Sequence, residues 1–279
     1  MSRTILILSL LLGMMHSAFA QITCSPEDTL RFRQKTEQLK GLQAKQFGDA
    51  IVQIGKTFLD TPYVEKTLEV GPTETLVINL RGLDCTTFVE NVLAFAHLLR
   101  HNKDTFDDFA QALKTIRYRN GELQGYGSRL HYFTDWIRNN EQKGLVQNIS
   151  GALGGETLEK PINFMGTHRE LYPFLKEDSN YKTILATEAM LAQEPLCVVG
   201  QDRLAVIEDK LQNGDIIALA TSIKGLDVTH TGFAIRMPSG RIHLLHASIS
   251  GAVTITANPL PDYLKKIKNN IGIIVTRPL

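Results

Sequence analysis

A cysteine stands at the start of a predicted buried helix, where a nucleophile can be activated. Asp84 is a good N-cap residue, and apolar residues recur every three or four positions from Cys85 to Leu99, which predicts a helix over 85–99. The free N–H groups and positive dipole end of such a helix favour a thiolate and can hold an oxyanion. The structural alternative is a buried, unreactive Cys85, because most free cysteines behave as small hydrophobes.

Two histidines fall on a predicted β-hairpin with strands at 228–235 and 241–248. The turn 238–240 (PSG) gives a three-residue loop, and that loop sets a register in which His230 and His246 share one face, one diagonal step apart. One imidazole can then act as a base toward a nucleophile, while the other fixes its tautomer. A two-residue turn would send His246 to the opposite face.

Other roles for these three residues are also open. A lone strand histidine is usually structural, and Cys85, His230 and His246 together have the residue types of a zinc site. The chain has no paired C-x-x-C and no H-E-x-x-H spacing, and no resolving cysteine lies near Cys85, which argues against zinc and thiol redox chemistry. We therefore expect neither a metal nor another cofactor.

Helices are expected to carry the first half of the chain and strands the second. The patterns predict helices at 26–40, 44–58, 85–99, 105–118, 168–176 and 179–193, the first and last of them capped by Ser25 and Ser179. Strands are predicted at 216–220, 228–235, 241–248, 252–256 and 271–276, with a short extended piece at 75–80. The stretches 121–136 and 141–167 are interpreted as loops and short strands.

The domain organisation follows from this order of elements. No repeat or long linker interrupts the chain, so we expect a single α+β domain over 21–279, with an insertion around 101–205. In this domain the nucleophile-bearing helix packs on an antiparallel sheet, and extra helices and loops surround it.

Composition excludes some classes of partner. The chain has 279 residues, of which 43% are hydrophobic and 21% charged, and its formal net charge is +1. These values are ordinary for a globular protein, and they argue against nucleic acid or an anionic membrane as the main partner.

The N-terminus has the pattern of a targeting segment. Arg3 precedes the apolar run 5–12, and Ala18-Phe19-Ala20 is a small-x-small cleavage pattern, so 1–20 is predicted to be a signal peptide cut after Ala20. The run is too short to span a membrane, and no later stretch is long enough, so no membrane insertion is expected after cleavage. We expect export, to a bacterial periplasm.

An exported protein with three cysteines raises the question of disulfides. An odd count in an oxidising compartment leaves at least one thiol free or paired with another chain. A Cys24–Cys197 disulfide would leave Cys85 free as a nucleophile, and we carry it forward as an expectation.

Four short segments carry a family resemblance. They are 84–89 (DCTTFV), 213–217 (NGDII), 230–235 (HTGFAI) and 245–248 (LHAS). In this order they resemble the NlpC-type cysteine peptidases, which are papain-like bacterial cell-wall hydrolases. The segments 80–91 (LRGLDCTTFVEN) and 128–137 (SRLHYFTDWI) resemble a narrower branch, described as N-acetylmuramoyl-L-alanine amidase-like. That likeness covers nearly the whole mature chain.

The resemblance implies a papain-like (NlpC-type) core and a set of catalytic roles. It implies that Cys85 is the nucleophile, His230 the general base and His246 the orienting third member. Tyr63 resembles the tyrosine that lines the oxyanion site in this superfamily. Asp84 occupies a position that can contact substrate, and it also caps the helix.

The branch likeness implies a substrate as well. It implies cleavage of the amide between the muramic acid lactyl group and L-alanine in muropeptides, including anhydro-muropeptides. Arg81, Tyr126, Arg129 and His131 are the candidates for sugar or peptide contacts. The alternatives are a D-glutamyl-diaminopimelate endopeptidase and a non-catalytic muropeptide-binding protein.

Overall fold

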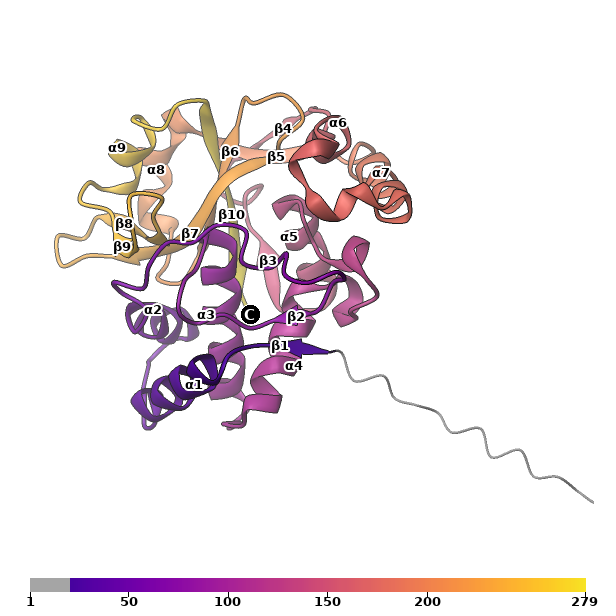
Figure 1. Ribbon diagram of the computed structural model, residues 1–279. Helices are drawn as coiled ribbons and strands as arrows, with labels where there is room; N and C mark the ends of the chain where they lie inside the picture. Colours follow the sequence, from indigo (N-terminus) through magenta and orange to yellow (C-terminus); the bar gives the residue numbers. More distant parts are fainter. Residues whose placement is uncertain (1–20) are drawn as a thin grey trace, which may run out of the picture.

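Helices of the first half of the chain form one side of the molecule (Figure 1). The structure is a computed structural model that describes residues 21–279, so the predicted signal peptide 1–20 and its cleavage after Ala20 lie outside the described residues. The helices are α1 Pro26–Leu39, α2 Phe47–Lys56, α3 Cys85–Arg100 and α4 Phe106–Arg117. They confirm, within a few residues, the first four helices that the sequence patterns predict.

Two of these helices begin with the same local chemistry. The Thr87 N–H donates to Asp84 Oδ1 at 2.8 Å, and the Asp84 N–H donates to Thr87 Oγ1 at 2.9 Å, which is a reciprocal capping box. Ser25 and Asp28 form the same arrangement at the start of α1. Because Asp84 ends the preceding loop in extended conformation, Cys85 is the first residue of α3.

An antiparallel sheet forms the second layer, which confirms the α+β class. Its order is β4-β5-β10-β6-β7-β8-β9, and β3 pairs with β10. The strands are β3 Val146–Asn148, β4 Glu156–Leu158, β5 Leu196–Gly200, β6 Ile216–Thr221, β7 Val228–Arg236, β8 Ile242–Ala247, β9 Val253–Ile255 and β10 Asn270–Pro278. A separate parallel pair joins β1 Ile22–Thr23 to β2 Leu76–Val77, part of the predicted extended piece.

The β7–β8 hairpin has the predicted register. Phe233 pairs with Leu245 and Arg236 with Ile242, as a three-residue loop requires. Gly240 provides the left-handed residue of that loop, with φ at 83°. His230 and His246 therefore lie on the same face of the sheet.

Aromatic contacts attach α3 to this hairpin. The ring centroids of Phe88 and Phe233 lie 5.7 Å apart in an edge-to-face arrangement, and Phe58 contacts Phe88 in the same way at 6.1 Å. All three side chains are buried. This packing fixes the first turns of α3 against β7, the strand that carries His230.

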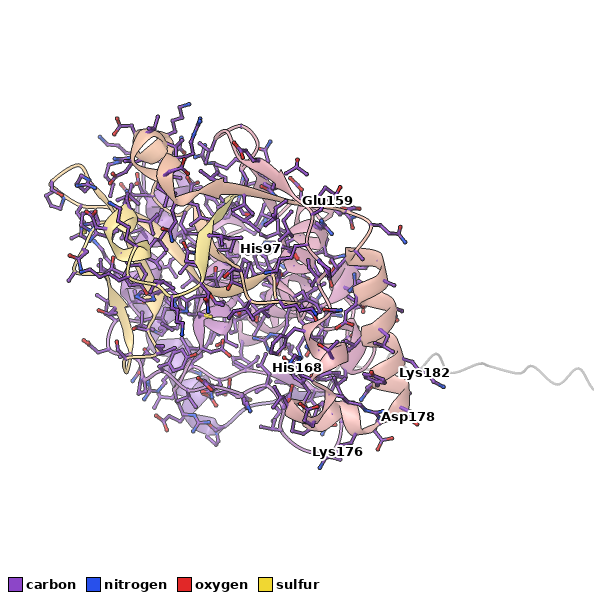
Figure 2. All side chains as sticks on the ribbon, turned by 90° about the horizontal axis from the view of Figure 1, so that it is seen from above. His97, Glu159, His168, Lys176, Asp178 and Lys182 are labelled. Carbon is purple, nitrogen blue, oxygen red and sulfur yellow. The ribbon has the colours of Figure 1, made fainter. Side chains whose placement is uncertain are left out.

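The part of the chain between α4 and β5 differs most from what the sequence patterns predict. Residues predicted as loops form α5 Phe133–Gln142, and the predicted helix 168–176 is two 3₁₀ turns, η3 Arg169–Leu171 and η4 Pro173–Lys176, because Pro173 cannot continue a helix. Helix α7 is Asp178–Leu191, so Ser179 lies inside its first turn and is not the cap. Figure 2 shows α7 at the edge of the molecule, near His168 and Lys176.

Shorter elements complete the fold. They are α6 Phe164–Thr167, α8 Leu204–Ile207, α9 Leu260–Leu264, η1 Arg119–Gly121, η2 Tyr126–Ser128, η5 Gln201–Arg203 and η6 Glu208–Lys210. In the part of the chain that the structure describes, no helix is both long and apolar enough to cross a membrane.

The cysteines do not pair as expected. Cys24, Cys85 and Cys197 are all free thiols, so the expected Cys24–Cys197 disulfide is wrong. Cys24 follows β1 and is exposed, whereas Cys197 lies within β5, opposite Thr157 of β4.

Candidate active site

Cys85 lies at the first turn of α3, with polar groups around its thiol. Backbone N–H groups of Thr231 and Thr86 and the Thr86 hydroxyl lie close to its sulfur, where they act to lower its pKa. Burial and the Asp84 charge nevertheless raise the pKa of the Cys85 thiol to about 12. The expectation that the helix start favours a thiolate is therefore wrong for the unliganded protein, because desolvation outweighs the N–H groups.

His230 and His246 form a hydrogen-bonded pair beside this thiol. His230 Nε2 lies 2.6 Å from His246 Nδ1, and the two rings are nearly perpendicular, at 89°. Burial lowers the pKa of His230 to about 3, with a contribution from His246, and lowers the pKa of His246 to about 4. Both imidazoles are thus neutral near pH 7. Thr231, whose N–H contacts the Cys85 thiol, directly follows His230.

Gly232 allows the two histidines to come together. A Cβ added at this position would lie 2.8 Å from His246 Cβ and 2.7 Å from the Leu245 carbonyl oxygen, which is too close for either. The glycine in the sequence HTGFAI is therefore required by the close approach of β8.

A Gly232→Ala variant tests this packing. We expect it to lower kcat/KM about 100-fold or more, because the methyl group displaces His246 from His230. Overpacking should also reduce the free energy of unfolding by about 1–3 kcal/mol. Steady-state kinetics with urea denaturation checks both effects, and wild-type activity in a folded variant contradicts this explanation.

Tyr63 and Asp84 both lie near Cys85. The Tyr63 N–H donates to the Gly251 carbonyl at 2.8 Å, and Tyr63 bridges to Leu83, two residues before the cysteine. Burial, followed by the charges of Cys85 and Asp84, raises the pKa of the Tyr63 phenol, which stays protonated and able to donate. Asp84 Oδ1 accepts two hydrogen bonds from Thr87, so this oxygen is engaged as the helix cap.

The other predicted contact residues from the loop region form a separate cluster. Tyr126 donates from its hydroxyl to Glu69 at 3.0 Å, and its carbonyl lies 2.9 Å from His131 Nε2. Arg129 is only 11% exposed and forms ion pairs with Glu69 at 3.3 Å and Glu74 at 2.9 Å. Two carboxylates therefore already balance the Arg129 charge. Burial holds the pKa of His131 well below its usual range, so this ring is neutral.

Arg81 is more available to a ligand. Its Nε lies 3.1 Å from Asp28 Oδ1, while its side chain remains 44% exposed. Asp28 also accepts the Leu80 N–H at 2.9 Å, which fixes the loop that leads into Cys85. The structure thus brings Cys85, His230, His246, Tyr63 and Asp84 together and places Arg81 on the adjoining loop.

Comparisons with known proteins show the family of this chain. The family model described as N-acetylmuramoyl-L-alanine amidase-like (AmiA-like) matches residues 53–273. The chain belongs to this family. No curated protein matches it.

Solved structures related to this amidase-like chain extend over most of its length. An N-acetylmuramoyl-L-alanine amidase from Bacteroides uniformis superposes with a TM-score of 0.79 at 36% identity, covering 84% of this chain and 99% of that one. A putative xylanase from Bacteroides fragilis superposes with a TM-score of 0.75 at 41% identity, covering 80% of this chain and 98% of that one. A Legionella pneumophila protein of the DUF1460 family shares the fold. It superposes with a TM-score of 0.66 at 22% identity, covering 91% of this chain and 95% of that one. The family and these structures support a peptidoglycan amidase-like hydrolase.

One residue near the candidate site was not found from the sequence. Tyr263, on α9, packs its ring against His246 with centroids 5.7 Å apart, and its pKa is raised by burial and by the Cys85 charge. It therefore lies near both groups. Nothing in the sequence LPDYL points to the site, because only the packing of α9 against β8 brings this ring there.

The metal alternative also has a structural answer. Within residues 21–279, no group of three or more His, Cys, Asp or Glu side chains is arranged to hold a metal ion.

Proposed function

We propose that this protein is an exported, periplasmic cell-wall hydrolase, an N-acetylmuramoyl-L-alanine amidase that acts on muropeptides by Cys-His nucleophilic catalysis. The observation that carries this proposal is the position of the His230–His246 pair beside Thr231, whose N–H contacts the Cys85 thiol. Membership of the amidase-like family supports the amide as the bond that is cut.

The protonation states suggest how the first step proceeds. His230 Nε2 is engaged with His246 Nδ1, which leaves His230 Nδ1 to accept a proton. The Cys85 thiol transfers its proton to this nitrogen as the sulfur attacks the lactyl carbonyl carbon. Backbone N–H groups at the start of α3 and the Tyr63 phenol are the proposed donors to the oxyanion.

The remaining steps return the enzyme to its starting state. The tetrahedral intermediate collapses to a thioester as the C–N bond breaks, and the L-alanine amine leaves with the proton from His230. His230 then takes a proton from water, which attacks the thioester; the C–S bond breaks, the muramic acid carboxylate is released, and the Cys85 sulfur takes the proton back from His230. His246 keeps the His230 ring in one orientation throughout.

Product analysis tests the proposed bond. The purified mature protein is incubated with an anhydro-muropeptide and, separately, with the free peptide stem, and the digests are analysed by mass spectrometry. Release of an intact L-alanine-led peptide together with the sugar acid supports the amidase. Cleavage after D-glutamate would assign the endopeptidase alternative instead. No cleavage of either compound by the reduced enzyme would favour the non-catalytic binding protein.

The pH dependence of kcat/KM distinguishes a neutral Cys-His pair from an ion pair. With the pKa of His230 at about 3, of His246 at about 4 and of Cys85 at about 12, both partners keep their neutral form across a wide range. We expect a kcat/KM plateau from about pH 5 to about pH 9. A fall in kcat/KM near pH 8–9, where the imidazolium of a thiolate–imidazolium pair would lose its proton, would contradict the neutral pair.

The same shifts affect stability at low pH. The unfolded chain begins to take up protons on these histidines near the ordinary value of 6.5, while the folded protein does not. Folding stability therefore falls as the pH drops below about 6.5. The kinetic profile should be recorded only where circular dichroism shows a folded enzyme.

A further inference from the structure

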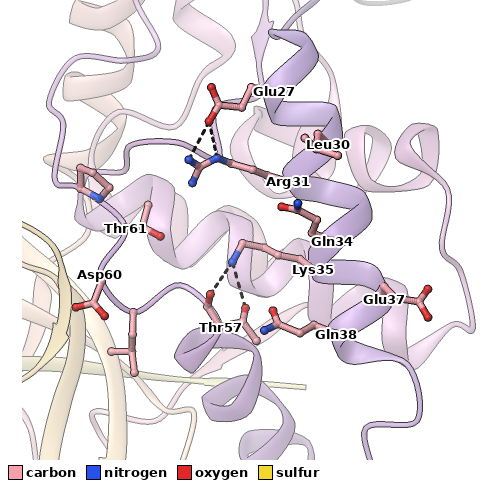
Figure 3. A pocket seen from close by; sticks show the side chains of 12 residues that line it. Glu27, Leu30, Arg31, Gln34, Lys35, Glu37, Gln38, Thr57, Asp60 and Thr61 are labelled. Atoms are coloured by element: carbon pink, nitrogen blue, oxygen red, sulfur yellow. Dashed lines mark hydrogen bonds and ion pairs between the residues drawn. The ribbon is translucent and has the colours of Figure 1, made fainter.

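A groove beside the catalytic loop has no role in the reaction described above. It has a volume of about 1040 Å³ and lies between α1 and the turn 57–62. Figure 3 shows the side chains of Arg31, Lys35 and Gln38 directed from α1 toward that turn, whereas Glu37 points away. The lining also includes Glu27 and Glu37, so the α1 wall carries both cations and carboxylates.

Lys35 is the notable charge in this groove. It is only 9% exposed, its Nζ lies 2.7 Å from the Thr57 carbonyl oxygen, and it sits 3.6 Å above the centre of the Phe58 ring. Within residues 21–279, its ammonium group has no carboxylate within ion-pair distance. Buried charges are usually paired with an opposite charge, whereas the Thr57 carbonyl, the Thr57 hydroxyl at 3.4 Å and the Phe58 ring compensate this cation only in part.

The acids near the groove do not supply the missing charge. Glu27 is engaged with Arg31, at 2.8 Å, and Glu37 with Lys40. Asp60, on the turn, is exposed to water, which screens its charge more strongly than that of Lys35. The buried part of the groove is therefore positive.

The groove also ends close to the nucleophile. Pro62 forms its last wall, and the Pro62 carbonyl accepts the Leu83 N–H at 3.0 Å, two residues before Cys85. Tyr63, which lies near the thiol, is the next residue. Pro62 and Tyr63 thus join the groove to the loop that leads into Cys85.

We propose that this groove binds the peptide part of the substrate, with a peptide carboxylate paired to Lys35. The proposal rests on the proposed function, because the D-glutamyl and diaminopimelyl residues of a muropeptide stem carry free carboxylates. Pairing with a cation removed from water makes such a contact strong and specific for acidic peptides.

Binding to an inactive variant tests the groove without turnover. The probes are the tripeptide L-alanyl-D-glutamyl-diaminopimelic acid and its fully amidated form, titrated by calorimetry into Cys85→Ala protein. Adding Lys35→Met should weaken binding of the acidic tripeptide about tenfold or more and leave the amidated form unchanged. Lys45→Met is the matched control, because Lys45 is exposed and does not line the groove, and it should change neither affinity.

Two further variants keep the test valid if Lys35→Met does not fold. Lys35→Arg retains the charge and should still bind the acidic tripeptide. Gln38→Glu adds a carboxylate to the groove without removing the Lys35–Thr57 bond, and should weaken binding about tenfold. Equal affinity of Lys35→Met, Gln38→Glu and the parent protein, or no tripeptide binding, overturns the proposal.

The two proposals can fail separately. If the active enzyme cleaves no muropeptide while tripeptide binding depends on Lys35, the proposed function is wrong and the groove stands. If the enzyme cleaves muropeptides while binding is independent of Lys35, the groove proposal is wrong and the amidase stands.

Discussion

Replacement of Cys85 by alanine should abolish turnover, with a fall in kcat of about 10⁴-fold or more and no loss of folding. An alanine methyl group cannot act as a nucleophile, and groups that act as one catalytic unit lose most of their effect when one is removed. Only one sulfur atom is removed, so the cavity that the substitution leaves is small.

The measurement needs a control that separates catalysis from substrate binding. Turnover of an anhydro-muropeptide is followed by mass spectrometry, while calorimetry of the tripeptide shows whether the site is intact. Cys85→Ser serves as the matched variant, since a hydroxyl is a far weaker nucleophile in this setting. Retained turnover in folded Cys85→Ala protein would assign the reaction to another group.

Removal of the Glu90 carboxylate should produce the largest loss of stability among single substitutions near the site. Glu90 of α3 and Arg117 of α4 form an ion pair at 2.7 Å, and both side chains are only 2% exposed. Arg117 also donates to the Val77 carbonyl, so the pair joins α3, α4 and β2. Glu90→Gln leaves a buried guanidinium without a counter-charge, and we expect a loss of about 3–5 kcal/mol.

Urea denaturation of a variant series checks this expectation. The double variant Glu90→Leu with Arg117→Met should be more stable than either single variant, because no uncompensated charge then remains. Glu37→Gln breaks the exposed pair with Lys40 and should leave the unfolding midpoint unchanged. If Glu90→Gln unfolds at the same urea concentration as the parent protein, groups other than Glu90 compensate the Arg117 charge.

The sequence predicts those parts of the fold that depend on residues close together in the chain, such as turns and helix caps. The register of the β7–β8 hairpin follows from the number of loop residues and from Gly240. The start of α3 follows from Asp84, because the reciprocal bonds with Thr87 involve only residues three apart. These two facts place the candidate nucleophile and both histidines.

Other features depend on contacts between distant segments. Helix α5 has no side-chain cap and contains two asparagines, so its sequence resembles a loop, yet Trp136 and Ile137 are buried in the core. The position of Tyr263 depends on how α9 packs against β8. The neutral state of Cys85 depends on burial by segments far along the chain, which outweighs the helix start.

The position of β10 has a consequence for biosynthesis. This strand, residues 270–278, lies between β5 and β6 and also pairs with β3. The sheet that supports the histidines therefore cannot close while the ribosome still holds these residues, and its inner edges stay unpaired until then.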